Sequence, residues 1–322
     1  NIAVEKNYEI ESFDVSTTFL NAPIDREIYI RPPRSYENVK IDRAESVKLL
    51  KLKKCIYGLT ISPVMWNQCF NDTLKKVGFT RSRLDKCVYY NKELEIYIGI
   101  YVDDAIIIGD RKKVNVIMKE IEKVFEITRD LDKFDFLGID IDRNQSTNEI
   151  TLSQETYIVN KSKEILNRKE RNNIRWIETP VTSTKELRKN DDTADLEKWK
   201  RKFYYRQAIG ILIWIARCTR PDILRAVSYL ASFNQSYGEE HVSEVKRVFQ
   251  YLLNTIDWKL RYKKSKDPDD LNKSLIEKLE FYSDSDWASC KETRKSTTGY
   301  MMIYNGTVIS NYSKRQPIIT TS

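Results

Sequence analysis

Two adjacent aspartates, Asp103 and Asp104, interrupt an otherwise apolar stretch of the sequence. They lie between the apolar runs 95–101 and 105–108, a pattern that predicts a β-hairpin. Carboxylates on a rigid hairpin could bind Mg²⁺ and support phosphoryl transfer. Aspartate is also a common turn residue, and for the pair alone the turn is the simpler interpretation.

Phosphoryl transfer with two metals needs another carboxylate, because ions about 4 Å apart must contact the attacking and leaving oxygens. Asp14 is the candidate, since it lies at the end of a strand predicted for residues 8–15. An aspartate there could also cap a turn, as could the hydroxyl residues that follow it. Together, Asp14, Asp103 and Asp104 form a three-carboxylate set on two neighbouring strands, which is the arrangement of a polymerase palm.

The composition predicts folded domains with a basic surface. The 322 residues are enough for two domains, and 41% hydrophobic with 32% charged residues argues against disorder. Lysine and arginine exceed aspartate and glutamate by 55 to 47, a net charge of +8. This excess is compatible with a polyanionic partner without proving one.

The cysteines and the lone histidine argue against zinc and disulfide frameworks. These residues are widely spaced: Cys55, Cys69, Cys87, Cys218, Cys290 and His241. Free buried thiols in a reducing compartment are the simplest expectation. The sequence contains neither a membrane-span pattern nor a signal-peptide pattern, so we expect an intracellular protein without a membrane partner. The absence of an initiator methionine suggests a piece of a longer chain.

The elements expected around the aspartates are short strands and amphipathic helices. Residues 8–15 predict the first strand. Ser62 and Pro63 precede apolar positions at helical spacing, which predicts an N-capped helix that ends at Gly78. Residues 114–125 repeat the helical spacing after the hairpin.

The second half of the sequence changes character twice. Residues 185–202 are charged without an apolar period, which predicts a linker or exposed loop. Helices and then strands follow, at residues 203–215, 221–233, 242–253, 279–283, 300–304 and 307–313. Asn305 and Gly306 predict a tight hairpin turn between the last two strands. The fold class is therefore α+β, ending in a β-meander.

Aromatic and basic residues of the helical region have two interpretations. Trp66, Trp214 and Tyr251 fall on apolar helix faces, so core packing is expected for all three. A basic cluster could contact a nucleic-acid backbone or form a solvated helix face: Lys161, Lys163, Arg168, Lys169 and Arg171.

Blocks of sequence along the whole chain resemble consecutive motifs of Ty1/copia reverse transcriptases, in the family's order. They are Phe13–Asn21, Ile28–Pro33, Ile56–Leu59, Tyr101–Asp104, Phe136–Ile139, Thr219–Ile223, Ser283–Ala288 and Arg294–Tyr300. Each block is weak alone, and the ordered series is strong. The resemblance implies a polymerase palm with thumb-like helices, followed by a truncated RNase H-like β-meander. It divides the chain into a palm at 1–165, a helical thumb or connection at 166–275, and the start of an RNase H-like domain at 276–322.

The resemblance also implies roles for individual residues. Asp14, Asp103 and Asp104 would hold two Mg²⁺ ions for attack of a primer 3′-hydroxyl on a nucleotide α-phosphate. Phe19 matches the bulky residue that excludes a 2′-hydroxyl, although it could be a plain core phenylalanine. Tyr101 would pack under the primer end. The implied partners are an RNA template, a DNA primer or RNA–DNA hybrid, and deoxynucleoside triphosphates.

The sequence departs from the family near the nucleotide. Ile61 stands where the family has a glutamine that contacts the incoming nucleotide, and it cannot make that hydrogen bond. Val64 replaces a cation, and Thr18, beside the triphosphate, replaces an alanine. The fingers segment that precedes Tyr8 in the family is almost wholly absent, so efficient nucleotide binding is in doubt.

Asp284 matches the first carboxylate of a two-metal RNase H site, whereas Asp286 could be a surface turn residue. The chain ends at Thr321-Ser322, where the family presents a glutamate of that site. We therefore expect Asp284 to be part of a vestigial metal site, without RNase H activity.

Three functions remain open. The first is RNA-directed DNA polymerase activity centred on the three aspartates. The second is a catalytically impaired remnant that binds RNA–DNA hybrid without turnover, which Ile61 and the absent fingers favour. The third, an unrelated palm-like nucleotidyl enzyme, is disfavoured by the block at 219–223 and the final strands. The expected location is cytoplasmic, including virus-like particles, or nuclear, and the sequence leaves the oligomeric state undetermined.

Overall fold

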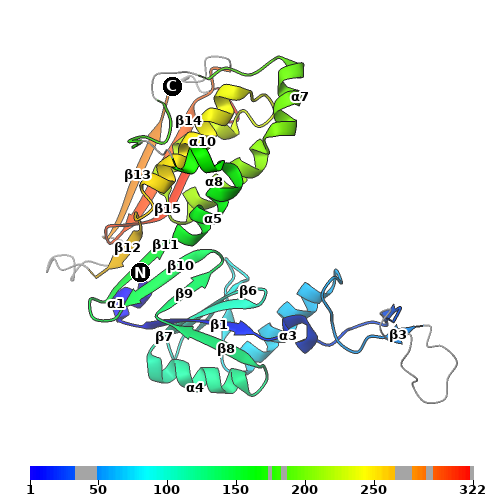
Figure 1. The fold of residues 1–322 in the computed structure, drawn as a ribbon. Helices are drawn as coiled ribbons and strands as arrows, with labels where there is room; N and C mark the ends of the chain where they lie inside the picture. The colour runs from blue at the N-terminus through cyan, green and yellow to red at the C-terminus, as the bar shows by residue number, and fades with distance from the viewer. Residues whose placement is uncertain (33–48, 173–175, 183–186, 265–277, 288–292, 320–322) are drawn as a thin grey trace. The chain divides into compact units, whose positions relative to one another are not determined.

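The computed structural model of the chain forms two compact units (Figure 1). One unit comprises residues 6–136, and the other comprises residues 1–5 with 137–322. The structure describes residues 1–32, 49–172, 176–182, 187–264, 278–287 and 293–319. The expected boundaries at residues 165 and 275 separate a palm, a thumb or connection and an RNase H-like region. They stay a prediction.

A six-stranded antiparallel sheet forms the centre of the 6–136 unit. In sheet order its strands are β4 (Thr80–Arg81), β5 (Val88–Asn91), β6 (Ile96–Tyr101), β7 (Asp104–Gly109), β1 (Glu9–Val15) and β8 (Ile127–Leu131). The predicted first strand and the predicted hairpin are confirmed as β1 and as β6–β7. The hairpin lies beside β1 in the sheet, although 80 residues of sequence separate Ile96 from Ser16.

Two helices cover one face of this sheet, α3 (Ser62–Lys76) and α4 (Arg111–Glu122) (Figure 1). Strand residues alternate between the two faces, so Phe13 and Val15 enter the core while Asp14 faces out. Burial of each large apolar side chain contributes about 1.5–3 kcal/mol. The packed face fixes the register, and with it the face on which Asp14 must lie.

The start of α3 differs from the prediction. Ser62 is the first helical residue, and Ile61 precedes it without a side-chain cap. The Ser62 hydroxyl instead donates to the Ile56 carbonyl at 2.7 Å. The predicted end is confirmed, because Gly78 follows the helix with a φ of 86°, a backbone conformation that favours glycine.

Short elements complete the 6–136 unit. They are α2 (Thr18–Asn21), the paired strands β2 (Tyr29–Ile30) and β3 (Leu50–Lys51), and β9 (Lys133–Phe136). The helix α1 (Ile2–Lys6) precedes β1. Strand β9 lies against β1, β7 and β8.

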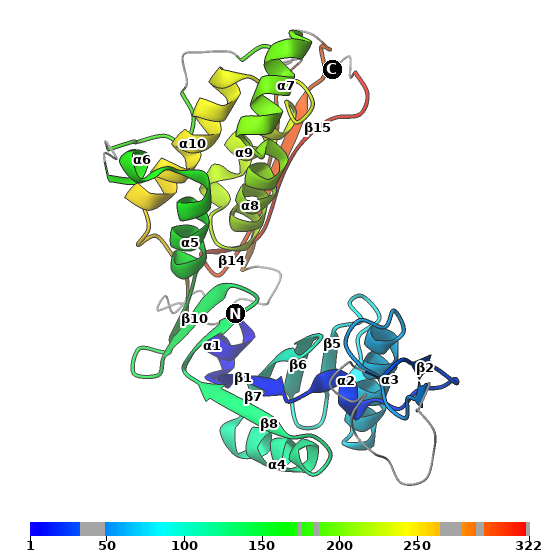
Figure 2. The same ribbon diagram turned by 45° about the vertical axis from the view of Figure 1, so that its right-hand side comes forward.

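The second unit combines a helical core with two groups of antiparallel strands (Figure 2). Its helices are α5 (Glu155–Ile165), α6 (Arg168–Asn172), α7 (Thr193–Lys202), α8 (Tyr205–Cys218), the 3₁₀ helix η2 (Pro221–Ile223), α9 (Leu224–Ala231) and α10 (Glu239–Asn254). Its strands are β10 (Ile139–Asn144), β11 (Glu149–Ser153) and β12 (Leu260–Lys263), followed by β13 (Leu279–Ser285), β14 (Thr297–Tyr304) and β15 (Thr307–Arg315). The mixture of helix and sheet confirms the α+β class.

The final β-meander is confirmed in detail. Strands β13, β14 and β15 pair in sequence order, and α9 packs against β15. Asn305 and Gly306 join β14 to β15 with φ values of 51° and 75°. Two successive positive φ angles are what a two-residue type I′ turn requires, and asparagine–glycine provides them at low cost.

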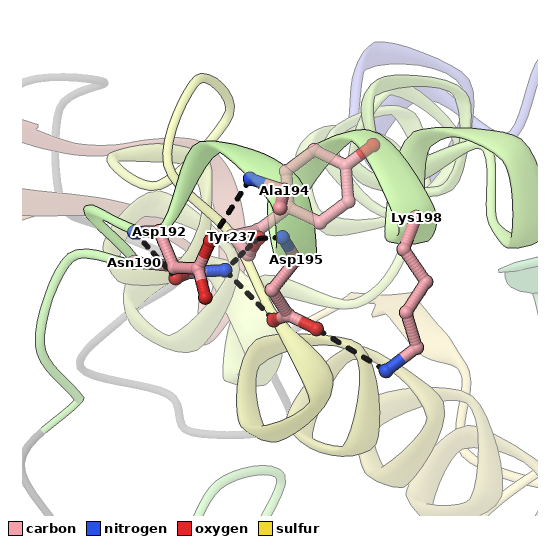
Figure 3. A network of polar contacts seen from close by, with 6 residues as sticks. All are labelled: Asn190, Asp192, Ala194, Asp195, Lys198 and Tyr237. Carbon is pink, nitrogen blue, oxygen red and sulfur yellow. Dashed lines mark hydrogen bonds and ion pairs between the residues drawn. The ribbon is translucent and has the colours of Figure 1, made fainter.

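The predicted linker at 185–202 is wrong for its second half, which forms α7. Asp192 caps this helix by accepting hydrogen bonds from the amides of Ala194 and Asp195 (Figure 3). Leu196 and Trp199, three residues apart, pack on the core of the unit. Two apolar positions among so many charged residues are too few to produce a recognisable helical periodicity in the sequence.

The aromatic and cysteine predictions are confirmed only in part. Trp66 and Tyr251 are buried, as predicted. The prediction of core packing is wrong for Trp214, which is 37% exposed.

Among the described cysteines none forms a disulfide, and Cys55 is buried while Cys87 is exposed. Cys290 and the ends of the motifs at Pro33 and Ala288 lie outside the described residues.

No helix in the described ranges is both long and apolar enough to cross a membrane.

Candidate active site

The register of β1 and β7 places Asp14 directly opposite Asp104. Directly opposed residues of an antiparallel pair point to the same face, with Cβ atoms about 4.5–5.5 Å apart. Both side chains are exposed on the face opposite the helix-covered core. The structure therefore brings together two aspartates that are separated by 90 residues in the sequence.

Asp103 belongs to the two-residue turn, Val102-Asp103, between β6 and β7. The Val15 amide donates to the Asp103 carbonyl at 3.4 Å, which ties the turn to the end of β1. The Trp66 indole donates to the Val102 carbonyl at 2.6 Å from the other side. The sequence analysis assigned Trp66 to the core alone and missed this contact with the turn.

Tyr101 extends the same row of side chains. It is opposite Asp104 in the β6–β7 register and is 58% exposed. Asp14, Asp104 and Tyr101 thus lie side by side on three adjacent strands. An exposed tyrosine beside two carboxylates offers a flat apolar surface against which a ligand could pack.

The carboxylates of the site repel one another. Partial burial and the nearby charge of Asp103 raise the pKa of Asp14 above its usual value. Partial burial also raises the pKa of Asp104, with further contributions from Asp103, Asp14 and Asp135. A bound cation would relieve this repulsion.

Asp135 is a further acidic residue close enough to Asp104 to raise its pKa, and the sequence did not indicate it. It lies on β9, the strand that packs against β1 and β7. The alternation of charged and apolar residues in Lys133–Phe136 is the signal that could have predicted this strand.

The site fits Mg²⁺ in its donor chemistry but is not a preformed cage. Carboxylate oxygens are hard ligands of the type that Mg²⁺ prefers. Within the described part of the chain, no three or more histidine, cysteine, aspartate or glutamate side chains are grouped to hold a metal ion. The strands bring the aspartates to the same end of the sheet, and their side chains would have to turn toward a common point to bind one ion.

The segment after β1 carries the two other predicted binding residues. The Thr18 hydroxyl is buried and donates to the Val15 carbonyl at 2.7 Å, so its hydrogen bond serves the local backbone. Phe19 is largely buried in the core, with its ring edge-to-face against Tyr57 at 4.7 Å between centroids. Tyr57 is exposed, so the Phe19–Tyr57 pair reaches from the core to the surface.

The two departures from the family lie at the start of α3. Ile61 precedes the helix and is partly buried, whereas Val64 is exposed in its first turn. Neither side chain can donate a hydrogen bond or carry a positive charge. The two side chains are therefore apolar at positions where the resemblance implies polar groups.

Asp284 belongs to the other unit, which comprises residues 1–5 and 137–322. It is on β13 opposite Gly299 and lines a cavity of about 490 Å³ between the meander and the η2–α9 segment. Asp286 accepts a hydrogen bond from the Thr297 amide at 2.7 Å, so its carboxylate joins the ends of β13 and β14. This contact supports the structural interpretation of Asp286.

The basic cluster of α5 and α6 is partly engaged in local contacts. Lys161 forms an ion pair with Glu164 at 2.7 Å, and Arg171 donates to the Lys163 carbonyl at 3.1 Å. These contacts support the interpretation as a solvated helix face for these two side chains.

Comparison with known proteins identifies relatives along the whole chain. Residues 1–182 match the family described as reverse transcriptase (RNA-dependent DNA polymerase). The chain is 31% identical over 329 residues to the retrovirus-related Pol polyprotein from transposon TNT 1-94 of Nicotiana tabacum, covering 100% of this chain and 23% of that protein. It is 28% identical over 324 residues to the Pol polyprotein from transposon RE1 of Arabidopsis thaliana, covering 100% of this chain and 20% of that protein.

A shorter relative matches over most of its own length. The chain is 30% identical over 307 residues to a putative transposon Ty5-1 protein of Saccharomyces cerevisiae, covering 94% of this chain and 92% of that protein. By contrast, the chain spans less than a quarter of the two Pol polyproteins. The chain belongs to the reverse transcriptase (RNA-dependent DNA polymerase) family, in the branch found in Pol polyproteins of Ty1/copia-type retrotransposons.

Proposed function

We propose that the chain catalyses RNA-directed DNA synthesis at the open face of the β6–β7–β1 strands. The observation that carries the proposal is the direct opposition of Asp14 and Asp104, next to the turn that bears Asp103. This arrangement brings two motifs that resemble those of the family together at one end of neighbouring central strands. The family match over residues 1–182 supports the reaction class.

In this proposal Asp14, Asp103 and Asp104 hold two Mg²⁺ ions. The ions, when bound, would stabilise the charge that develops as a primer 3′-hydroxyl attacks the α-phosphate of a deoxynucleoside triphosphate. The protein supplies rigid positions for the carboxylates, because β1 and β7 are central strands whose opposite face is packed.

The neighbouring residues would position the substrates. Tyr101 would pack under the primer end, as its exposure beside Asp104 allows. Phe19, braced by Tyr57, would limit the space at the sugar 2′ position. Thr18 would shape the triphosphate site through the local backbone that its hydroxyl holds. The RNA template and DNA primer would be bound largely through their phosphates.

Primer extension tests this proposal. The chain would be compared with Asp103→Asn and with a control, Asp110→Asn, on an RNA template with a DNA primer and Mg²⁺. Asp110 caps α4 and lies at the opposite end of β7 from Asp104, so its change should leave extension within about twofold. We expect Asp103→Asn to lower extension by about a hundredfold or more. Equal extension by both variants would contradict the proposal.

A second candidate is a protein that binds RNA–DNA hybrid without turnover. The specific observation in its favour is the apolar surface at Ile61 and Val64, where the family has a nucleotide-contacting glutamine and a cation. Hybrid binding without extension by any variant would support this candidate. Extension gained by Ile61→Gln would show that this residue is the limiting defect.

The other part of the proposal concerns the meander. We propose that β13–β15 correspond to the first strands of an RNase H-like domain, with Asp284 as a candidate metal ligand. Its position on β13, at the wall of a cavity, supports this assignment.

A further inference from the structure

A buried tryptophan supports the turn that carries Asp103. Trp66 lies on α3 with 2% of its surface exposed, and its Nε1–H donates to the Val102 carbonyl oxygen at 2.6 Å. An indole has one polar hydrogen and no acceptor, so this bond satisfies the whole polar capacity of the side chain. The contact connects α3 to the residue immediately before Asp103.

The residue that Trp66 holds has an unfavourable backbone conformation. Val102 has a φ of 60°, in the left-handed region that β-branched residues rarely occupy. Such a conformation persists only where the surroundings hold it in place. The Val102 side chain is 39% exposed, so packing around it contributes little. The hydrogen bond to its carbonyl therefore restrains the turn in addition to the pairing of Tyr101 with Asp104 across it.

The turn has a second, longer restraint. The Val15 amide donates to the Asp103 carbonyl at 3.4 Å, against 2.6 Å for the bond from Trp66. The two bonds hold successive carbonyls of the turn, one from β1 and one from α3. If the Trp66 bond were lost, only the longer bond from Val15 would remain of these two.

Trp66 is itself held rigidly by aromatic neighbours. Its ring is edge-to-face with Phe125 at 5.2 Å between centroids and tilted against Phe70 at 5.4 Å. The residue after Phe125 is Glu126, whose carbonyl accepts from the Ser16 amide at 2.9 Å. The same aromatic cluster thus supports the Asp103 turn and the chain just beyond Asp14.

We propose that Trp66 is a positioning residue for the reaction, acting through the Val102 carbonyl to fix Asp103 relative to Asp14 and Asp104. The inference rests on the proposed polymerase function for its effect on rate. The restraint of the turn by the indole N–H does not depend on the proposed polymerase function. A core role alone would need only apolar packing of the ring, part of which phenylalanine retains without the N–H donor.

The rate test compares Trp66→Phe with Tyr89→Phe. Tyr89 is a fully buried aromatic of the same core, and its hydroxyl has no hydrogen-bond partner among the described residues. Primer extension should show kcat lowered about tenfold or more in Trp66→Phe, with the KM for nucleotide within about twofold. Tyr89→Phe should match the unchanged chain. Equal kcat values for the two variants would overturn the inference.

Repeating the comparison in a Val102→Gly chain tests the restraint itself. It also separates an effect on the turn from a loss of folding in Trp66→Phe. Glycine adopts a φ of 60° without strain, so Val102→Gly should make the turn less dependent on Trp66. In that background the effect of Trp66→Phe on kcat should fall below about threefold. The same fold-change in both backgrounds would contradict the proposed restraint.

Hydrogen exchange separates a failure of this inference from a failure of the proposed function. Amides of residues 101–105 should exchange about tenfold faster in Trp66→Phe than in Tyr89→Phe, whether or not the chain extends primers. If the unchanged chain does not extend primers, the proposed function fails and this comparison alone decides the restraint. Identical exchange in the two variants would overturn it.

Discussion

At the scale of single residues, the three aspartates of the candidate site repel one another, and the bound cations that we propose would reduce this repulsion. Asp14 and Asp104 face each other, and Asp103 acts on both. Their raised pKa values mean that the folded chain binds these protons more tightly than the unfolded chain does. The associated stability is present below the ordinary aspartate pKa of 3.8 and is lost as pH rises through the raised values.

Asp104→Asn should therefore stabilise the chain at neutral pH while abolishing extension. The change removes one of the mutually repelling charges and keeps the size of the side chain. Thermal unfolding at pH 7 with a chelator should show a melting temperature higher by roughly 1–3 °C. A lower melting temperature than that of the unchanged chain would contradict the repulsion argument.

His241 should make stability depend on pH near neutrality. It is buried, and its Nδ1 accepts a hydrogen bond from the Gly238 amide at 3.1 Å at the start of α10. Burial lowers its pKa below 6.5, outweighing the nearby Glu240 charge and the Arg188 backbone. The stability it contributes is thus present above pH 6.5 and is lost as pH falls through the folded pKa.

Urea unfolding between pH 7.5 and 5.5 checks this expectation. The free energy of unfolding should fall with decreasing pH in the unchanged chain and fall less in His241→Gln. The assignment is direct because His241 is the only histidine in the sequence. Parallel pH profiles for the two proteins would rule out the role.

The sequence predicted that Asp14 and the Asp103-Asp104 hairpin lie on neighbouring strands, but it did not predict the residues that contact this region. Asp14 and Asp104 could be predicted from the sequence because strand alternation and the family motifs both indicate them. Trp66 was not, since its indole contacts a backbone carbonyl 36 residues away, and no periodicity records such a bond. Asp135 was missed for a similar reason, because β9 reaches the site only through the packing of strands.

At the scale of elements, α7 shows how a capped helix can be hidden among charges. Its cap, Asp192, is part of a polar network with Asn190, which donates to Asp195 at 3.0 Å and to the Tyr237 carbonyl at 3.1 Å (Figure 3). The stability of this helix rests on the cap and on a few tertiary contacts. Apolar periodicity, the main signal of a helix in sequence, is therefore weak here.

Asp192→Ala should destabilise α7 selectively. Loss of an N-cap costs about 1 kcal/mol, so residues 193–202 should exchange their amides about fivefold faster. Asp191→Ala is the matched control, since Asp191 does not accept the capping bonds. Equal exchange in the two variants would show that the cap contributes little.

Arg220 joins the loop after α8 to the end of α10. Its guanidinium is buried, forms a bidentate pair with Asp222 at 3.0 and 2.8 Å, and donates to the Thr255 carbonyl at 3.0 Å. The guanidinium carbon also lies 5.5 Å from the ring centroid of Tyr251 and 5.4 Å from that of Trp258. The family block at 219–223 is thus explained by a structural contact rather than by chemistry.

Arg220→Leu should lower the free energy of unfolding by about 3 kcal/mol, because the Asp222 carboxylate loses its bidentate cation and the Thr255 carbonyl loses a buried donor. Arg217→Leu is the control, since Arg217 is exposed on the same stretch of chain and should change stability by about 0.5 kcal/mol or less. Denaturant unfolding measures both. A loss no greater than that of Arg217→Leu would contradict the assigned role.

At the scale of the whole molecule, the residues that the structure describes form two apolar cores. One, around Phe13, Trp66 and Met118, lies in the 6–136 unit, and the other, around Tyr205, Leu212 and Phe249, lies in the 137–322 unit. Sequence order predicted the progression from sheet to helices to meander. It did not predict the compact unit ending at Phe136, because a division between cores depends on which side chains meet in space.

The central claim is that Asp14, Asp103 and Asp104 bind divalent ions together. Crystals of the chain with Mn²⁺, a primer–template and a non-hydrolysable nucleotide would test it through anomalous difference maps. The account predicts two peaks, with carboxylate oxygens of Asp14 and Asp103 within about 2.5 Å of the metal positions. Ordered nucleotide without a peak near both aspartates would contradict it.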